Sequence, residues 1–136
     1  MGRILGIDYG TKRVGLAVTD ELRIIATALA TIKEIEVISY IENYLKTNNV
    51  EAFVVGLPLK LDGTDTHATQ ATEKFVSLLA KKFPHLPVYR VDERFTSKIA
   101  QQTLLQMGLN KKQRASKENV DMISAVLILQ TYLDSI

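Results

Sequence analysis

The chain has 136 residues, of which 46% are hydrophobic, and its formal net charge is +2. This length fits one globular domain, so we expect residues 1–136 to form a single domain around one core. The absence of cysteine excludes disulfide bonds and cysteine-ligated zinc or iron–sulfur sites. No segment is long and apolar enough to cross a bilayer, and the N-terminal segment carries an acid, unlike a signal peptide. We therefore expect a cytoplasmic protein with no membrane partner.

Three apolar segments at the start of the chain predict an antiparallel meander. Arg3–Asp8 is a short apolar run that suits a buried central strand. Arg13–Thr19 alternates bulky residues with small ones, which predicts a strand with one face open to close approach. Gly10 lies between these segments, where a tight reversal needs a glycine. Residues 24–32 are expected to form the third strand.

The pattern then alternates between helical and extended periods. Helices are predicted at residues 35–45, 68–79, 99–107 and 120–133, and strands at residues 52–55 and 88–91. Gly108 directly follows the third of these helices, as a glycine at a helix C-terminus commonly does. The order predicts an α/β fold with a five-stranded mixed sheet, a meander followed by parallel strands, and helices on both faces.

Four acidic side chains stand at the ends of apolar elements, where the hydrophobic pattern gives no reason for them. Asp92, directly after the last strand, is one of them, and the other three are the candidates for a shared site. Asp8 closes the first strand, Glu93 follows the last strand, and Asp121 lies in the first turn of the final helix. Asp121 shares a helical face with Ala125 and Ile128, so it is expected to face the core. Ligands of open α/β sheets gather beyond the carboxyl ends of the parallel strands. We therefore expect the three acids to meet there as catalytic and metal-binding residues.

Such a cluster favours divalent cations. Neighbouring carboxylates repel one another unless a proton or a cation lies between them. Ions such as Mg²⁺ take a few carboxylate ligands and leave the other positions to water and substrate phosphate. Two such ions, roughly 3.5–4 Å apart, can hold the attacking and leaving oxygens of a phosphodiester. The acids therefore predict a metal-dependent nuclease.

Each acid also has a purely structural interpretation. Asp8 fits a turn, Asp121 fits the positive end of its helix, and Glu93 with Asp92 fits a surface salt network with neighbouring arginines. Whether Asp92 or Glu118 joins the cluster stays open.

Basic residues near these acids suit contacts with phosphates, which position a nucleic acid without reading its sequence. The residues that we assign to nucleic-acid contacts are Lys12, Arg13, Arg94, Lys111, Lys112 and Arg114. The last three, taken alone, fit a solvated basic loop equally well. Residues 58–65 contain Gly63 and polar side chains, and we expect them to form a loop over the site.

Four segments resemble the motifs of the YqgF/RuvX family. They are residues 6–17 (GIDYGTKRVGLA), residues 55–58 followed by 63–64, residues 92–97 (DERFTS), and residues 120–121 with 124–125 and 128–130. The likeness spans essentially the whole chain in the order of the family. Ser124 stands where the family tends to have alanine, a difference too small to disturb packing.

The resemblance implies a ribonuclease H-like fold and a cytoplasmic enzyme that hydrolyses phosphodiester bonds with Mg²⁺ or Mn²⁺. It also implies a role in maturing the 5′ end of the precursor of 16S ribosomal RNA, and hence in ribosome biogenesis. Members were at first provisionally named Holliday junction resolvases. Asp8, Glu93 and Asp121 match the three acids of the family. We expect Asp8 to bridge two ions while Glu93 and Asp121 each hold one.

Three other functions stay open at this point. The chain could be a resolvase that acts on four-way DNA, which would require a dimer with two sites. It could be a nucleic-acid-binding module without catalysis. A phosphotransferase of the actin-like class is a third alternative, although such enzymes close over a nucleotide with two domains. The choice between RNA and branched DNA, the cleavage position, the preferred metal, and monomer versus homodimer are not decided by the sequence.

Overall fold

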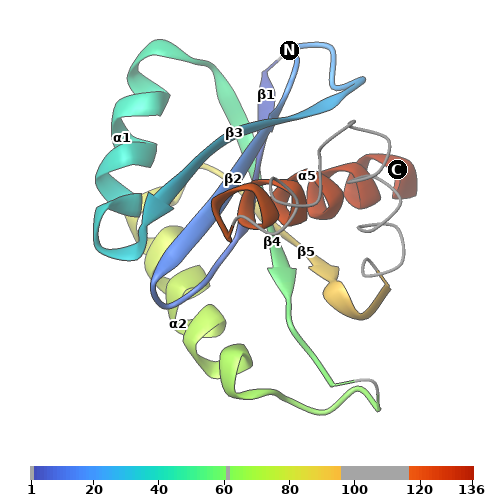
Figure 1. The fold of residues 1–136 in the computed structure, drawn as a ribbon. Helices are drawn as coiled ribbons and strands as arrows, with labels where there is room; N and C mark the ends of the chain where they lie inside the picture. The colour runs from blue at the N-terminus through green and yellow to red at the C-terminus, as the bar shows by residue number, and fades with distance from the viewer. Residues whose placement is uncertain (1, 61, 96–116) are drawn as a thin grey trace.

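The computed structural model describes residues 2–60, 62–95 and 117–136. In chain order the elements are β1 (Arg3–Asp8), β2 (Arg13–Thr19), β3 (Ala26–Lys33), the 3-10 helix η1 (Glu34–Glu36), α1 (Val37–Thr47), β4 (Val50–Leu57), α2 (His67–Lys82), β5 (Val88–Asp92), the 3-10 helix η2 (Glu93–Phe95) and α5 (Lys117–Ser135) (Figure 1). No helix of these residues is both long and apolar enough to pass through a lipid bilayer.

The five strands form one mixed sheet in the order β3-β2-β1-β4-β5. β1 pairs antiparallel with β2, and β2 pairs antiparallel with β3. β4 pairs in parallel with both β1 and β5. The predicted mixed sheet is confirmed. Because β1, β4 and β5 run in the same direction, their carboxyl ends lie at one edge of the sheet.

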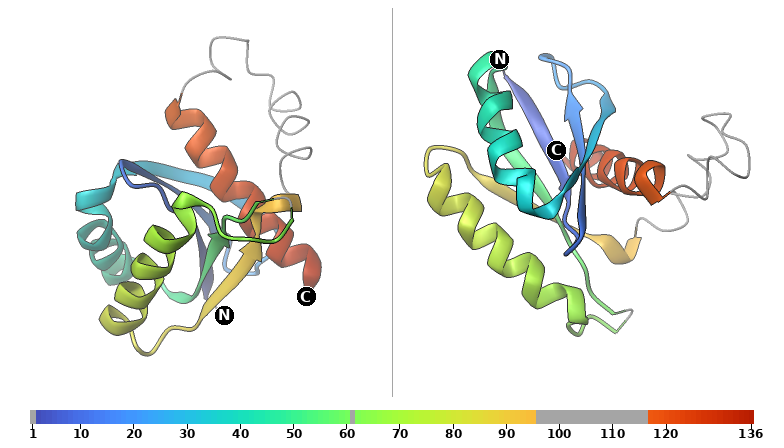
Figure 2. Two further views of the ribbon diagram at one scale, coloured as in Figure 1. Left: turned by 90° about the horizontal axis from the view of Figure 1, so that it is seen from below. Right: turned by 60° about the vertical axis from the view of Figure 1, so that its left-hand side comes forward.

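Helices cover both faces of the sheet, as predicted (Figure 2). On one face, α1 and α2 pack over a core that includes Leu5, Ile7 and Phe53. On the other face, α5 packs over Ile4 and Val54. The two central strands are buried from both sides, which is why their sequences are continuous apolar runs.

α5 approaches the sheet very closely because the strands beneath it carry glycines. A Cβ atom built on Gly15 would lie 2.0 Å from the backbone oxygen of Asp121, and one built on Gly6 would lie 2.8 Å from the Cβ atom of Leu129. Ala125 lies in the same contact and is fully buried. The open face predicted for Arg13–Thr19 is therefore the face on which α5 lies.

Several predicted boundaries differ from the structure by one to three residues, among them the starts of β3 and α5. β3 begins at Ala26, because the Asp20 carboxylate accepts hydrogen bonds from the backbone N–H groups of Ile24 and Ile25 at 2.8 and 3.0 Å and holds both in the turn. α5 already includes Lys117, so Asp121 lies beyond its first turn. A helix dipole acts mainly within that turn and does not explain this acid. The helix predicted at residues 99–107, with Gly108, falls outside the described residues.

Candidate active site at the carboxyl edge of the sheet

Asp8 and Glu93 meet at the carboxyl edge of the sheet, on the face that α5 covers. Asp8 is the last residue of β1, and Glu93 follows β5 directly. β4 runs between them and carries Gly56 at this level. A Cβ atom on Gly56 would lie 2.7 Å from the carboxyl carbon of Glu93. The missing side chain therefore makes room for the Glu93 carboxyl group above β4, where it forms a hydrogen bond with Asp8.

The two carboxyl groups share a proton. The pKa of Asp8 is raised to about 8, first by burial, then by the charge and hydrogen bond of Glu93, and last by the charge of Asp121. Burial also raises the pKa of Glu93, although its hydrogen bond with Asp8 and the nearby Arg90 oppose this increase. A carboxyl–carboxylate hydrogen bond requires one proton, so near neutral pH the pair carries a single negative charge. A divalent cation can replace that proton, because it neutralises the same oxygens more strongly.

Asp121 approaches the pair from α5. Its backbone oxygen lies over Gly15, the residue that pairs with Asp8 across β1 and β2. Its carboxylate is close enough to Asp8 to raise the pKa of Asp8 by charge repulsion. However, its Oδ2 atom accepts a hydrogen bond from Arg13 Nε at 2.9 Å. Within residues 2–60, 62–95 and 117–136, no three acidic or histidine side chains are arranged as a ready-made metal site.

Asp92 is paired with Arg94. Its Oδ2 atom lies 2.8 Å from Nε and 2.6 Å from a terminal nitrogen of Arg94, a two-point ion pair. The guanidinium of Arg94 holds the pKa of Asp92 below its usual range. Of the two adjacent acids, Glu93 lies with Asp8 and Asp92 is engaged elsewhere. The side chain of Glu118 is outside the described part of the chain.

The described residues of the polar segment, 58–60 and 62–65, are held together by hydrogen bonds near Arg94. Leu59 bridges to Asp65, and the backbone N–H of Lys60 donates to the backbone oxygen of Thr64 at 2.8 Å. Gly63 has a φ of +88°, a left-handed conformation that favours glycine, and a Cβ atom there would lie 3.3 Å from Arg94. A lid function for this segment stays a prediction.

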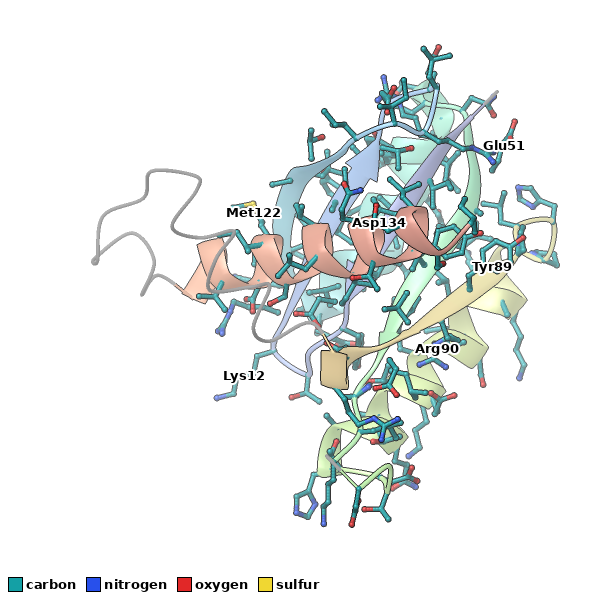
Figure 3. All side chains as sticks on the ribbon, turned by 90° about the vertical axis from the view of Figure 1, so that its right-hand side faces the viewer. Lys12, Glu51, Tyr89, Arg90, Met122 and Asp134 are labelled. Carbon is teal, nitrogen blue, oxygen red and sulfur yellow. The ribbon has the colours of Figure 1, made fainter. Side chains whose placement is uncertain are left out.

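Two cavities lie on either side of the chain reversal that follows β1. One, of about 570 Å³, is lined by Lys12, Arg13 and Lys33, together with Thr31, Ile32 and Glu36. The other, of about 380 Å³, is lined in part by Tyr9. The ring of Tyr9 stacks on the ring of Phe75 in α2, with 4.5 Å between the ring centroids. Lys12 lies at the end of the sheet near the start of α5, whereas Glu51 lies at the opposite end (Figure 3).

Lys12 and Arg13 are among the predicted nucleic-acid contacts, whereas Lys33, which lines the same cavity, is not. Lys33 lies directly opposite Arg13 in the pairing of β3 with β2, and the sequence alone does not define this register. The predicted contacts at Lys111, Lys112 and Arg114 fall outside the described residues.

Comparisons with known proteins cover nearly the whole chain. Residues 2–135 match the RuvX family, described as Holliday junction resolvase. A protein of Christiangramia forsetii is 50% identical over 133 residues, which make up 98% of each chain. A protein of Amoebophilus asiaticus is 47% identical over 135 residues, 99% of this chain and 96% of that one. Both relatives bear the name "Putative pre-16S rRNA nuclease".

Solved structures with this fold are more distant in sequence. Thermus thermophilus RuvC in complex with a Holliday junction substrate aligns with a TM-score of 0.59 at 16% identity, covering 99% of this chain and 96% of that one. A second Thermus thermophilus RuvC structure aligns with a TM-score of 0.52, also at 16% identity, over 98% and 96% of the two chains. These alignments confirm the ribonuclease H-like fold. The chain belongs to the RuvX family, as the match over residues 2–135 and the relatives of 47–50% identity show.

Proposed function

We propose that the protein is a metal-dependent endonuclease that hydrolyses RNA, with the 5′ end of the precursor of 16S ribosomal RNA as its target. The observation that carries this proposal is the partly buried pair of Asp8 and Glu93 in a chain whose full-length relatives bear that nuclease name. Residues 1–136 would act as one nuclease domain in the cytoplasm, where ribosomal RNA precursors mature.

Asp8, Glu93 and Asp121 are proposed as the catalytic and metal-binding residues. Their oxygens are the donors that Mg²⁺ and Mn²⁺ prefer, and the shared proton of Asp8 and Glu93 marks a place where a positive charge is favourable. When bound, two such ions lower the pKa of a water molecule and stabilise the leaving 3′ oxygen. The chain holds the acids in place: β1 and η2 present the pair, Gly56 leaves space for it, and α5 brings Asp121 over Gly15.

Basic side chains around the acids are proposed to hold the nucleic-acid backbone. Arg13, the first residue of β2, is partly buried and pairs with Asp121, and the preceding Lys12 is exposed. Arg94 would contribute from η2, where Asp92 orients its guanidinium. Lys111, Lys112 and Arg114 would extend this surface. Such contacts position a strand and make binding depend on salt.

Four-way DNA is the second candidate substrate. Two observations favour it: the description of the RuvX family, and the fold shared with a RuvC structure solved on a Holliday junction. Cutting both strands of a junction requires two sites related by a two-fold axis, and therefore a homodimer. A monomer that cleaves the RNA precursor would remove this candidate.

The purified protein tests the proposal directly. It is given ribosomal RNA precursor or four-way DNA with Mg²⁺ or Mn²⁺, alongside the variants Asp8→Asn and Asp92→Asn. We expect metal-dependent cleavage of the RNA that Asp8→Asn eliminates at any RNA concentration. Asp92→Asn should still cleave at saturating RNA, because Asp92 lies outside the proposed metal site and orients only Arg94, a proposed phosphate contact. Equal cleavage by Asp8→Asn, with the fold intact by circular dichroism, would remove the proposal. Selective cutting of the junction would transfer it to DNA.

A further inference from the structure

The carboxylate of Asp121 is neutralised by a cation of the chain itself. Arg13 and Asp121 are 108 residues apart in sequence, and Arg13 Nε donates to Asp121 Oδ2 at 2.9 Å. Their side chains are 35% and 23% exposed, so water reaches both. Partly exposed pairs of this kind contribute little stability and exchange partners at small cost. In this state Arg13 occupies an oxygen that the proposed metal site requires.

Arg13 also borders a cavity that suits an anion. Arg13 and Lys33 are direct partners across β2 and β3, so their side chains lie on one face of the sheet. That face carries Gly15 two residues further along β2, and Gly15 pairs with Asp8. Both cations line the cavity of about 570 Å³, which Lys12 also borders, so three cations outnumber the one acid in its lining, Glu36. This predominantly basic cavity therefore adjoins Asp121 through Arg13.

We propose that a backbone phosphate of the substrate strand binds in this cavity between Arg13 and Lys33, draws Arg13 away from Asp121, and so frees Asp121 for a divalent cation. The inference rests on the proposed function and assigns Lys33 as a phosphate contact. A guanidinium forms two parallel hydrogen bonds with a phosphate, whereas Nε of Arg13 makes a single contact with Asp121. Substrate and cation then strengthen the binding of each other, and the coupling is reciprocal.

Because Arg13 competes with a cation for Asp121, removing Arg13 should change the affinity for metal even without nucleic acid. The affinity for Mn²⁺ is measured at low salt by electron paramagnetic resonance for the wild type, Arg13→Ala and the control Lys33→Ala. We expect Arg13→Ala to raise the affinity about 2- to 5-fold, the factor that a partly exposed ion pair supplies. Lys33→Ala removes the same charge from the same face but leaves Asp121 paired, so its effect is smaller. An equal effect of the two variants, or an effect of Arg13→Ala that persists in an Asp121→Asn background, would overturn the inference.

The exchange also predicts that RNA strengthens metal binding. The same Mn²⁺ titration is repeated with a saturating short single-stranded RNA whose linkages resist hydrolysis. The wild type should bind Mn²⁺ more tightly with this RNA, and Arg13→Ala should show no gain. Wild-type affinity that is unchanged by RNA contradicts the exchange while leaving RNA cleavage through Asp8 intact. A wild type that binds no Mn²⁺ at all contradicts the proposed function and the exchange together.

Discussion

Replacing Asp8 by asparagine should stabilise the metal-free protein. Asparagine has nearly the shape of aspartate, and its amide can donate to Glu93 without a proton from solvent. The pKa of Asp8 is about 8 in the folded chain and 3.8 in its ordinary state. Each pKa unit corresponds to about 1.4 kcal/mol, so taking up this proton at pH 7 costs at most about 4 kcal/mol of folding free energy. Solvent near the partly buried pair offsets part of that cost, and we expect a gain of about 1–3 kcal/mol.

The pH dependence follows from the direction of the shift. Because the pKa of Asp8 is raised on folding, the folded state binds more protons than the unfolded state between about pH 4 and pH 8. Stability of the wild type should therefore fall as pH rises through this window. Asp8→Asn should show a much flatter profile, so that the variant gains most at pH 8 and least at pH 5.

Urea denaturation in the presence of a chelator, at intervals from pH 5 to pH 8, measures this effect. Asp92→Asn is the matched control, because the pKa of Asp92 is lowered by its pair with Arg94. That variant should lose a little stability across the whole range. A wild type whose stability is constant or rises between pH 5 and pH 8, or an Asp8→Asn variant that is less stable at pH 8, would refute the account of the shared proton.

Three further variants test the packing and the electrostatics of the site. Gly15→Ala should lower the free energy of unfolding by about 1–3 kcal/mol or more, because the new Cβ atom would lie 2.0 Å from the backbone oxygen of Asp121. An unchanged midpoint of urea denaturation would show that α5 does not lie this close to β2. Gly56→Ala places a Cβ atom 2.7 Å from the carboxyl carbon of Glu93. It should therefore reduce RNA cleavage strongly, while the affinity for RNA stays near that of the wild type. Cleavage at the wild-type rate would contradict the position of Glu93. Lys12→Ala should reduce the salt dependence of binding to single-stranded RNA. The slope of log affinity against log salt concentration should become about 0.7 less steep, which is the contribution of one phosphate contact. An unchanged slope would exclude Lys12 from the interface.

The sequence predicted the architecture because apolar spacing alone distinguishes the elements. β1 and β2 match their predicted bounds, Arg3–Asp8 and Arg13–Thr19. The alternation of large and small residues along β2 also indicated the face on which α5 packs. The prediction was wrong where a side chain decided the boundary: the Asp20 carboxylate binds two backbone N–H groups and delays the start of β3 to Ala26.

The candidate site was predictable in part. Asp8 and Glu93 stand at strand ends, where an acid has no packing role, and the parallel order of β1, β4 and β5 places those ends at one edge. The ion pair of Arg13 with Asp121 was not predictable, because nothing local in sequence links residues 108 positions apart. The space that Gly56 leaves for Glu93 depends on the register of β4 with its neighbours, which the apolar pattern does not define.

The position of bound metal tests the central claim most directly. Crystals grown or soaked with Mn²⁺ and short RNA would be measured at the manganese absorption edge, where anomalous scattering locates the ion independently of the protein coordinates. The account predicts manganese within about 2.0–2.4 Å of carboxylate oxygens of Asp8, Glu93 and Asp121, the range for oxygen ligands of small divalent ions. Manganese bound elsewhere on the protein, with the Asp8–Glu93 hydrogen bond and the Arg13–Asp121 pair both unchanged, would contradict it.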